Sequence, residues 1–240
     1  MIPSSFATCT AKENHEWLIG EYLDQLAKQK PNKVVDVGCG SGMLLKACRE
    51  RGIKAAGIDS AGPNLDALRE SGFEVSEGSA YSMPFEDRSV DWISLRHVPH
   101  HLEDPRRAFA ELLRVADRGV ILAEPHFDLS ELSQACAESL DVWEKRQHRR
   151  RGMVHDEVYD LGALLQMMPK GYQRDFHVQA LRTLRLRSRD LGKFATEARG
   201  LLAGLEPEHK ECLALKELIR EIEKTGLTWN GSLLVVLSRR

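Results

Sequence analysis

Several features that mark specialised classes of protein are missing from this sequence. It has no apolar run long enough to cross a bilayer, and its first residues lack the basic and then apolar pattern of a secretory signal. Its formal net charge is only −2, so no overall field attracts it to nucleic acid or to an anionic membrane. Its five cysteines are odd in number and form no CxxC pair, which argues against a disulfide framework and for a reducing compartment. We therefore expect a cytoplasmic protein without a membrane partner.

The composition that remains is that of a globular protein, with 42% hydrophobic and 29% charged residues. The length of 240 residues suits one large α/β domain, or such a domain with a lid. The sequence contains no internal repeat and no low-complexity linker. We expect a single domain that covers residues 1–240.

The most informative stretch is a buried strand, residues 34–37, that leads into glycines at 38, 40 and 42 and then into a helix over residues 43–51. Glycines let the backbone turn tightly and let a ligand approach without a Cβ in the way. The helix behind them offers unpaired N–H groups and the positive end of its dipole. A dinucleotide site usually has the spacing G-x-G-x-x-G, whereas this turn has G-x-G-x-G. The pattern predicts a cofactor-binding corner.

A second short strand, residues 55–59, ends in Asp59. A carboxylate at such a strand end can accept hydrogen bonds from both hydroxyls of a ribose. The alternative is that Asp59 is a turn or cap residue before a helix near Pro63. Because the strand follows the glycine turn by one βα unit, we favour ribose binding.

Further stretches continue this pattern toward the middle of the chain. Residues 77–93 read as a loop followed by a fourth strand, and residues 119–125 read as a fifth strand. With Asp36 just before the glycine turn, they resemble the class I S-adenosylmethionine-dependent methyltransferases. The resemblance covers residues 33–125, and the matching stretches are 34–42, 55–59, 77–85, 87–93, 99–105, 111–115 and 119–125.

This resemblance implies a fold, a cofactor and a reaction. The fold is α/β, a doubly wound, mostly parallel seven-stranded sheet of the Rossmann-like methyltransferase type with helical lid insertions. The cofactor is S-adenosyl-L-methionine, and the reaction is transfer of its methyl group to a small-molecule acceptor. The implied cofactor-binding residues are Asp36, Gly38, Cys39, Gly40 and Gly42 at the methionine end, Asp59 and Ser60 at the ribose, Ser79 and Ala80 at the adenine, and Arg96.

Two positions depart from the family pattern. Many members carry an aspartate where this chain has Ser79, so the charge-assisted bond to the adenine is lost. The family usually has a Pro-Gly-Gly turn before the fifth strand, of which only Gly119 survives. These departures leave open a non-catalytic S-adenosylmethionine-binding module. The motifs are also compatible with a nicotinamide dehydrogenase or with an RNA methyltransferase that acts on tRNA.

Methyl transfer needs an acceptor atom in line with the sulfonium–methyl bond, and positioning supplies much of the acceleration. In open α/β sheets ligands bind at the C-terminal ends of the strands. We therefore expect His97 to contact the reacting region. Glu124 orients the acceptor or caps the sheet edge, and these two interpretations stay open. His100 and His101 are read as structural, and no metal site is expected, because Pro99 interrupts the histidine spacing.

Beyond residue 125 the chain becomes more helical. The patterns predict helices over residues 128–151 and 156–168, a strand over 176–187, and a last strand over 232–237. Two further helices are marked by Leu191, Phe194, Ala195 and Ala198, and by Cys212, Leu215, Ile219 and Ile222 after Pro207. We expect a core of roughly residues 30–127, 153–189 and 228–240, and helical lid elements of roughly residues 1–29, 128–152 and 190–226.

The basic run Lys145–Arg151 is the one feature that suggests an anionic partner. It is more simply a solvated helix end, where cations also favour the negative end of the dipole. If this run merged with Arg185, Arg187 and Arg189, a tRNA would become a credible acceptor. We expect a small-molecule acceptor instead, and the sequence leaves the oligomeric state open.

Overall fold

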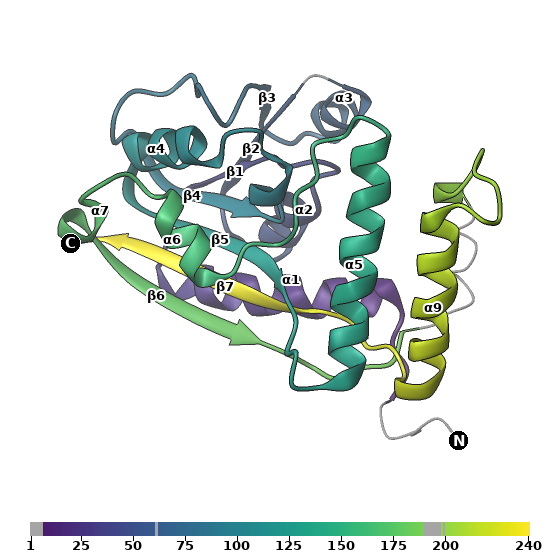
Figure 1. Cartoon of the computed structure of the whole chain (residues 1–240). Coiled ribbons are helices and arrows are strands. Elements are labelled where there is room, and N and C mark those ends of the chain that lie inside the picture. Colours follow the sequence, from purple (N-terminus) through teal and green to yellow (C-terminus); the bar gives the residue numbers. More distant parts are fainter. Residues whose placement is uncertain (1–6, 61, 190–197, 199) are drawn as a thin grey trace. The chain divides into compact units, whose positions relative to one another are not determined.

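A computed structural model of the chain describes residues 7–60, 62–189, 198 and 200–240. The chain divides into two compact units, each assembled from separate segments. The sheet unit comprises Ile19–Glu124, Tyr159–Arg182 and Leu233–Arg240, and the helical unit comprises Met1–Leu18, Pro125–Val158 and Thr183–Ser232. Figure 1 shows the elements of both. The assignment of the helical segments to a lid stays a prediction.

The sheet unit is built on seven strands in the order β3-β2-β1-β4-β5-β7-β6 (Figure 1). β1 pairs in parallel with β2 and β4, and the pairs β2–β3 and β4–β5 are parallel too. The arrow of β7 runs opposite to that of β6 (Figure 1). This sheet confirms the predicted mostly parallel, seven-stranded fold. The strands are β1 Val34–Val37, β2 Ala55–Asp59, β3 Val75–Glu77, β4 Val90–Arg96, β5 Ala116–His126, β6 Phe176–Thr183 and β7 Gly231–Arg239.

Helices cover both faces of this sheet because its central strands are apolar on both sides. Val35 and Val37 of β1 pack in one core with Phe109 and other side chains of α4 and α6. Val34, which points the other way, packs in a second core with side chains of α1 and α2. The helices are α1 Ala11–Lys28, α2 Met43–Glu50, α3 Pro63–Glu70, the 3-10 helix η1 Pro99–His101, α4 Pro105–Val115, α6 Leu161–Met167 and α7 Tyr172–Asp175.

The helical unit centres on two helices, α5 Leu132–Arg150 and α9 Lys210–Thr225, which pack side by side (Figure 1). Trp143 of α5 and Ile222 of α9 belong to their common core. α5 begins later than predicted because Asp128 caps a turn first, with its Oδ1 accepting from Ser130 N at 3.1 Å. The helix predicted around Leu191 lies outside the described residues except for Ala198.

Two other predicted boundaries were wrong, and so was the interpretation of Gly119 as the remnant of a turn. The helix predicted over residues 156–168 begins only at Leu161, because the Oδ1 atom of Asp160 caps it by accepting from Ala163 N at 2.7 Å. β6 ends at Thr183 and not at residue 187. Gly119 is no remnant of a turn: α4 joins β5 directly, and Gly119 lies inside β5. A Cβ there would come within 2.6 Å of the Trp92 ring, so close packing and not a turn requires this glycine.

Among the described residues, no helix combines the length and the apolar character needed to cross a membrane.

Candidate functional site

The glycine turn after β1 has the conformation that the sequence pattern predicts. Gly38, Gly40 and Gly42 have φ values of 73°, 51° and 73°, in the left-handed region that favours glycine. The N–H groups of Gly38 and Cys39 donate to the carbonyl of Ile58 at 2.8 and 3.1 Å. These backbone hydrogen bonds therefore hold the turn against the end of β2.

The three glycines differ in what surrounds them. A Cβ on Gly38 would lie 2.6 Å from a methyl group of Val98, whereas a Cβ on Gly40 would meet nothing within 4 Å. Gly42 precedes α2 without a side-chain cap, so the first N–H groups of that helix have no intrahelical partner. Open space over Gly40 beside an uncapped helix start forms a cradle for the polar end of a ligand.

Asp59 binds the glycine turn from the end of β2. Its Oδ2 accepts from Gly40 N at 2.5 Å, and its Oδ1 accepts from Ser60 N at 2.7 Å. The next helix, α3, is preceded by Gly62 and not by Asp59, so the alternative of a helix cap does not apply. The carboxylate is half-buried and each oxygen has further lone pairs. It can accept from ligand hydroxyls while it keeps the turn in place.

Asp36 lies underneath the turn in a buried hydrogen-bonded chain. Its Oδ1 is 2.8 Å from Ser94 Oγ, Ser94 Oγ is 2.8 Å from the hydroxyl of Tyr22, and that hydroxyl is 3.0 Å from the carbonyl of Ile121. These are three hydrogen bonds, but two hydroxyls supply only two protons. While Asp36 is ionised, Ser94 donates to it and Tyr22 donates to Ile121, and a proton taken up by Asp36 would supply the third hydrogen bond. Burial raises the pKa of Asp36 to about 6, partly offset by the Ser94 hydrogen bond and by Arg96.

The remaining predicted cofactor-binding residues lie at two places: Ser79 and Ala80 in the loop after β3, and Arg96 at the end of β4. The N–H of Gly78 donates to the carbonyl of Asp59 at 2.9 Å, which keeps the start of the β3–β4 loop beside the end of β2. Ser79 is exposed there, and its Oγ accepts from Tyr81 N at 3.2 Å. Arg96 is the last residue of β4. The C-terminal ends of β1, β2, β3 and β4 thus bring together the predicted cofactor-binding residues.

His97 follows β4 in a strained conformation. Its φ is 56°, which few residues other than glycine adopt, and its N–H donates to the carbonyl of Ala123 at 2.8 Å. Such strain is common where function fixes the backbone. The structure places His97 at the end of β4, where the sequence predicts the reacting region.

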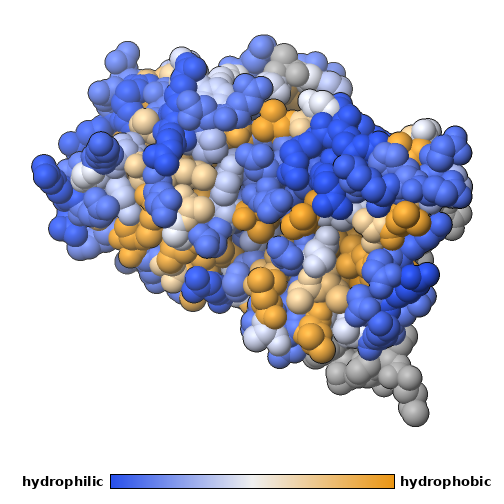
Figure 2. Space-filling view, in the orientation of Figure 1, coloured by the Kyte–Doolittle hydropathy of each residue, from blue (hydrophilic) through white to orange (hydrophobic). Residues whose placement is uncertain are grey.

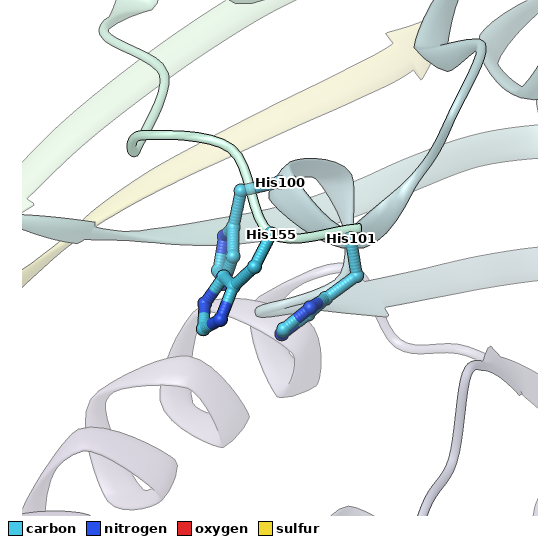
Figure 3. Close-up of side chains that lie close together, drawn as sticks. All are labelled: His100, His101 and His155. Carbon is cyan, nitrogen blue, oxygen red and sulfur yellow. The ribbon is translucent and has the colours of Figure 1, made fainter. Parts of the chain in front are cut away.

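Glu124 has no exposed surface, and both its oxygens lie within 3.0 Å of His100 Nδ1. His100 and His101 both belong to η1, and Figure 3 shows their rings on the same side of that turn. The ring centroids are 4.4 Å apart. The buried hydrogen-bonded pair of His100 and Glu124 connects the β4–α4 loop to β5. The geometry therefore favours a structural role for His100, and a role for Glu124 in positioning His100 and its loop.

Sequence reasoning missed Tyr22 and Ser94. Tyr22 lies in the apolar core beside α1 side chains, yet its hydroxyl joins the Asp36 chain. Ser94 could have been identified from the sequence, since it is a polar residue among the apolar residues of β4 and a buried polar side chain needs a hydrogen-bond partner. Cys39 is buried, and burial raises the pKa of its thiol to about 12, so it is no nucleophile at neutral pH.

Most basic side chains of the run at the end of α5 form ion pairs or hydrogen bonds within the helical unit. Arg146 pairs with Glu211 at 3.0 Å, Arg149 donates to the carbonyl of His155 at 2.7 Å, and Arg151 donates to the carbonyl of Gly200 at 2.5 Å. Lys145 is buried. Figure 2 shows a hydrophilic surface over this end of α5, but most of its cations already have partners. The interpretation as a nucleic-acid contact therefore loses its main support.

Comparison with known proteins assigns the glycine turn and its surroundings to one family. Residues 35–123 match the family model described as a methyltransferase domain. The ajmaline N-methyltransferase of Rauvolfia serpentina is 31% identical over 137 residues, which cover 52% of this chain and 46% of that protein. The chain spans less than half the length of the first curated relatives that it matches.

Solved structures agree with this chain over most of its length. The crystal structure of the YcgJ protein from Bacillus subtilis has a TM-score of 0.62 at 18% identity and covers 94% of this chain and 99% of its own. A methyltransferase from Archaeoglobus fulgidus, described as dependent on S-adenosylmethionine, has a TM-score of 0.58 at 16% identity, with coverages of 95% and 96%. At these identities the likeness concerns the fold. Residues 35–123 of this chain thus match a methyltransferase domain, and the chain has the fold of solved S-adenosylmethionine-dependent methyltransferases.

Proposed function

We propose that this protein transfers the methyl group of S-adenosylmethionine to a small-molecule acceptor. The observation that carries the proposal is the cradle at Gly40, where open space lies over the backbone between an uncapped helix and a carboxylate. The engaged basic run supports a small acceptor over RNA. One matched relative is named as an N-methyltransferase of ajmaline, a small molecule.

The bound cofactor would supply an electrophilic methyl group on a sulfonium. An acceptor lone pair would bond to that methyl carbon, and the electron pair of the broken carbon–sulfur bond would stay on sulfur. This chain's residues position the reactants and exclude water. The methionine end would lie on Asp36, Gly38, Cys39, Gly40 and Gly42, the ribose on Asp59 and Ser60, and the adenine on Ser79 and Ala80, with Arg96 nearby.

His97 is proposed to contact the reacting region and to take the proton of an acceptor that enters protonated. Glu124 is proposed to act through His100, because a side chain with no exposed surface cannot touch an acceptor. Methyl-labelled S-adenosylmethionine, incubated with amines, phenols and carboxylates and separately with total tRNA, tests the reaction. We expect label in the small molecules. Cofactor binding with no transfer to any acceptor would instead indicate a non-catalytic module.

Gly40→Ala is expected to weaken binding of S-adenosylhomocysteine at least tenfold. The new Cβ would enter the open space that we assign to the cofactor. Gly52→Ala is the matched control, since Gly52 also has a positive φ (69°) and open surroundings. Both changes cost about 1 kcal/mol of backbone strain, so their melting temperatures should fall alike. Calorimetry separates them, and an equal loss or no loss of affinity in the two variants would refute the cradle.

Asp59→Ala is expected to abolish discrimination between S-adenosylhomocysteine and its analogue without the ribose 2′- and 3′-hydroxyls. In the parent protein, the hydroxyls should contribute about 1–3 kcal/mol of binding through this carboxylate. The substitution also frees Gly40 N, but that cost affects both ligands equally and cancels in the comparison. If the variant still prefers the hydroxylated ligand by the same factor, Asp59 does not bind the ribose.

A further inference from the structure

The sheet unit contains a cavity of about 320 Å³ between strands β1 to β4 and the loop that joins β3 to β4. This loop, residues 78–89, is described throughout and contains no helix (Figure 1). Small-molecule sites in proteins are typically hollows of about 300–1,000 Å³. The cavity is therefore large enough for a small ligand, and every residue that lines it belongs to the sheet unit.

The inner part of the cavity is apolar. Val35, Ala56 and Ile58 line it from β1 and β2, and all three side chains are buried. Phe85 of the loop and Val90 at the start of β4 line it as well. Because burying a polar group here without a partner is costly, the lining favours an apolar body. An aromatic body would in addition pack favourably against the Phe85 ring.

The charged side chains of the lining are already paired. Lys33 Nζ lies 2.5 Å from an oxygen of Glu74, and Asp91 lies 3.4 Å from the guanidinium of Arg118. Lys33, Glu74 and Asp91 are all the charged residues that line the cavity. A charged ligand would therefore meet no unpaired opposite charge, and an uncharged ligand is the complementary one.

Ser89 supplies a hydrogen-bond acceptor at the exposed part of the lining. Its Oγ donates to the carbonyl of Glu86 at 2.8 Å. A hydroxyl has one proton and two lone pairs, so the lone pairs of Ser89 are what it can offer to a ligand. The matching group on that ligand is an O–H or N–H donor.

The volume indicates how large the ligand is. An apolar cavity of about 150 Å³ binds benzene, so a cavity about twice as large suits a body of two fused rings. We propose that this cavity binds an uncharged two-ring aromatic molecule that carries one O–H or N–H group.

This site is separate from the cofactor-binding edge of the sheet. Lys33 and Ser89 immediately precede β1 and β4, so the cavity borders the N-terminal ends of these strands. The predicted cofactor-binding residues lie at the C-terminal ends. Along β1, the path from Val35 to Gly38 is about 10 Å, at about 3.3 Å per residue. The proposed ligand is therefore neither the cofactor nor the methyl acceptor, and this proposal does not depend on the proposed function.

Fluorescence titration with 2-naphthol, which is uncharged at neutral pH, tests the proposal. We expect saturable binding at one site per chain. Three related probes each change one property: phenol has one ring, 2-naphthoate is charged, and 2-methoxynaphthalene has no O–H group. Phenol and 2-naphthoate should bind at least tenfold more weakly than 2-naphthol, and 2-methoxynaphthalene at least threefold more weakly. Absence of saturable binding, or equal affinity for 2-naphthoate, would overturn the proposal.

Two substitutions on β3 locate the site. Ser76 and Glu77 are both exposed, but only Ser76 lines the cavity, and successive side chains of a strand point to opposite faces. Ser76→Phe should fill the cavity and weaken 2-naphthol binding at least tenfold, whereas Glu77→Phe should leave it within twofold of the parent. Melting temperatures check that both variants fold.

Equal affinities of Ser76→Phe and Glu77→Phe for 2-naphthol would show that the probe binds elsewhere. Displacement of 2-naphthol by excess S-adenosylhomocysteine would place the probe in the cofactor groove and would also overturn the proposal. Binding of S-adenosylhomocysteine itself is measured in a separate titration without 2-naphthol. A failure there would contradict the proposed function and leave the result for the cavity intact.

Discussion

Asp36→Asn is expected to raise the free energy of unfolding at pH 8 by about 3 kcal/mol. The reason is that the parent protein must bury an ionised Asp36 at that pH, where burial opposes the charge. An asparagine stays neutral, and its amide can donate the third hydrogen bond of the chain to Ser94. The magnitude follows from a shift from 3.8 to about 6, at about 1.4 kcal/mol per unit.

The pH dependence of this effect has a definite sign. Because the pKa of Asp36 is higher in the folded state, the folded protein binds more protons than the unfolded chain between pH 4 and 6. The stabilisation from this proton is complete below pH 4 and is lost as the pH rises through 6. The two proteins should therefore have similar stability near pH 4 and diverge up to pH 7.

Urea unfolding of both proteins from pH 4 to pH 8 tests this expectation, since other titrating groups cancel in the difference. Asp66→Asn is a suitable control, because Asp66 is an exposed partner of Arg69. It should change stability by less than about 0.5 kcal/mol at every pH. Parallel pH profiles for the parent and Asp36→Asn would show that the pKa of Asp36 is the same in the folded and unfolded states, so that burial does not raise it.

His100→Leu is expected to lower the free energy of unfolding by about 3–5 kcal/mol. The substitution removes the imidazole partner of Glu124, which has no exposed surface, and breaking one side of a buried pair is costly. Adding Glu124→Leu should recover most of the loss, because an apolar pair of similar volume can replace a buried hydrogen-bonded pair.

His101→Leu is the control for this experiment, since His101 is the exposed neighbour of His100 on η1. Because its ring lies 4.4 Å from that of His100, this variant should lose some stability, but less than about 1 kcal/mol. Thermal and urea unfolding of all four proteins give the comparison. A double variant no more stable than His100→Leu alone would mean that the His100–Glu124 contact is not what this loop depends on.

Local signals explain what could be predicted from the sequence. The strand at residues 34–37, the glycine turn and the helix after it depend on neighbouring residues, and all three are found where the pattern put them. The cap of α4 is also local: Asp104 Oδ1 accepts from Arg107 N at 3.1 Å, as Asp-Pro at a helix start predicts.

Long-range contacts explain what could not be predicted. Ser94 forms hydrogen bonds with Asp36, 58 residues away, and with Tyr22, 72 residues away. The residues next to Ser94 in the sequence do not predict these partners. The family pattern suggested that Gly119 is part of a turn, whereas the Leu237 carbonyl and the Trp92 ring, both distant in sequence, leave no room for a Cβ there. The helix predicted over residues 156–168 starts at an aspartate, and aspartates at 156 and 160 are both residue types that can cap a helix. The structure, and not their type, shows that Asp160 begins α6.

The position of β7 has a consequence for synthesis of the chain. β7 lies between β5 and β6, yet about 100 residues separate the end of β5 from its beginning. At typical translation speeds, the edge of β5 that pairs with β7 stays without that strand for roughly 5 to 20 seconds. An uncovered apolar strand edge invites pairing with other nascent chains. Shielding by a chaperone at the ribosome would therefore matter most for the interval between these two strands.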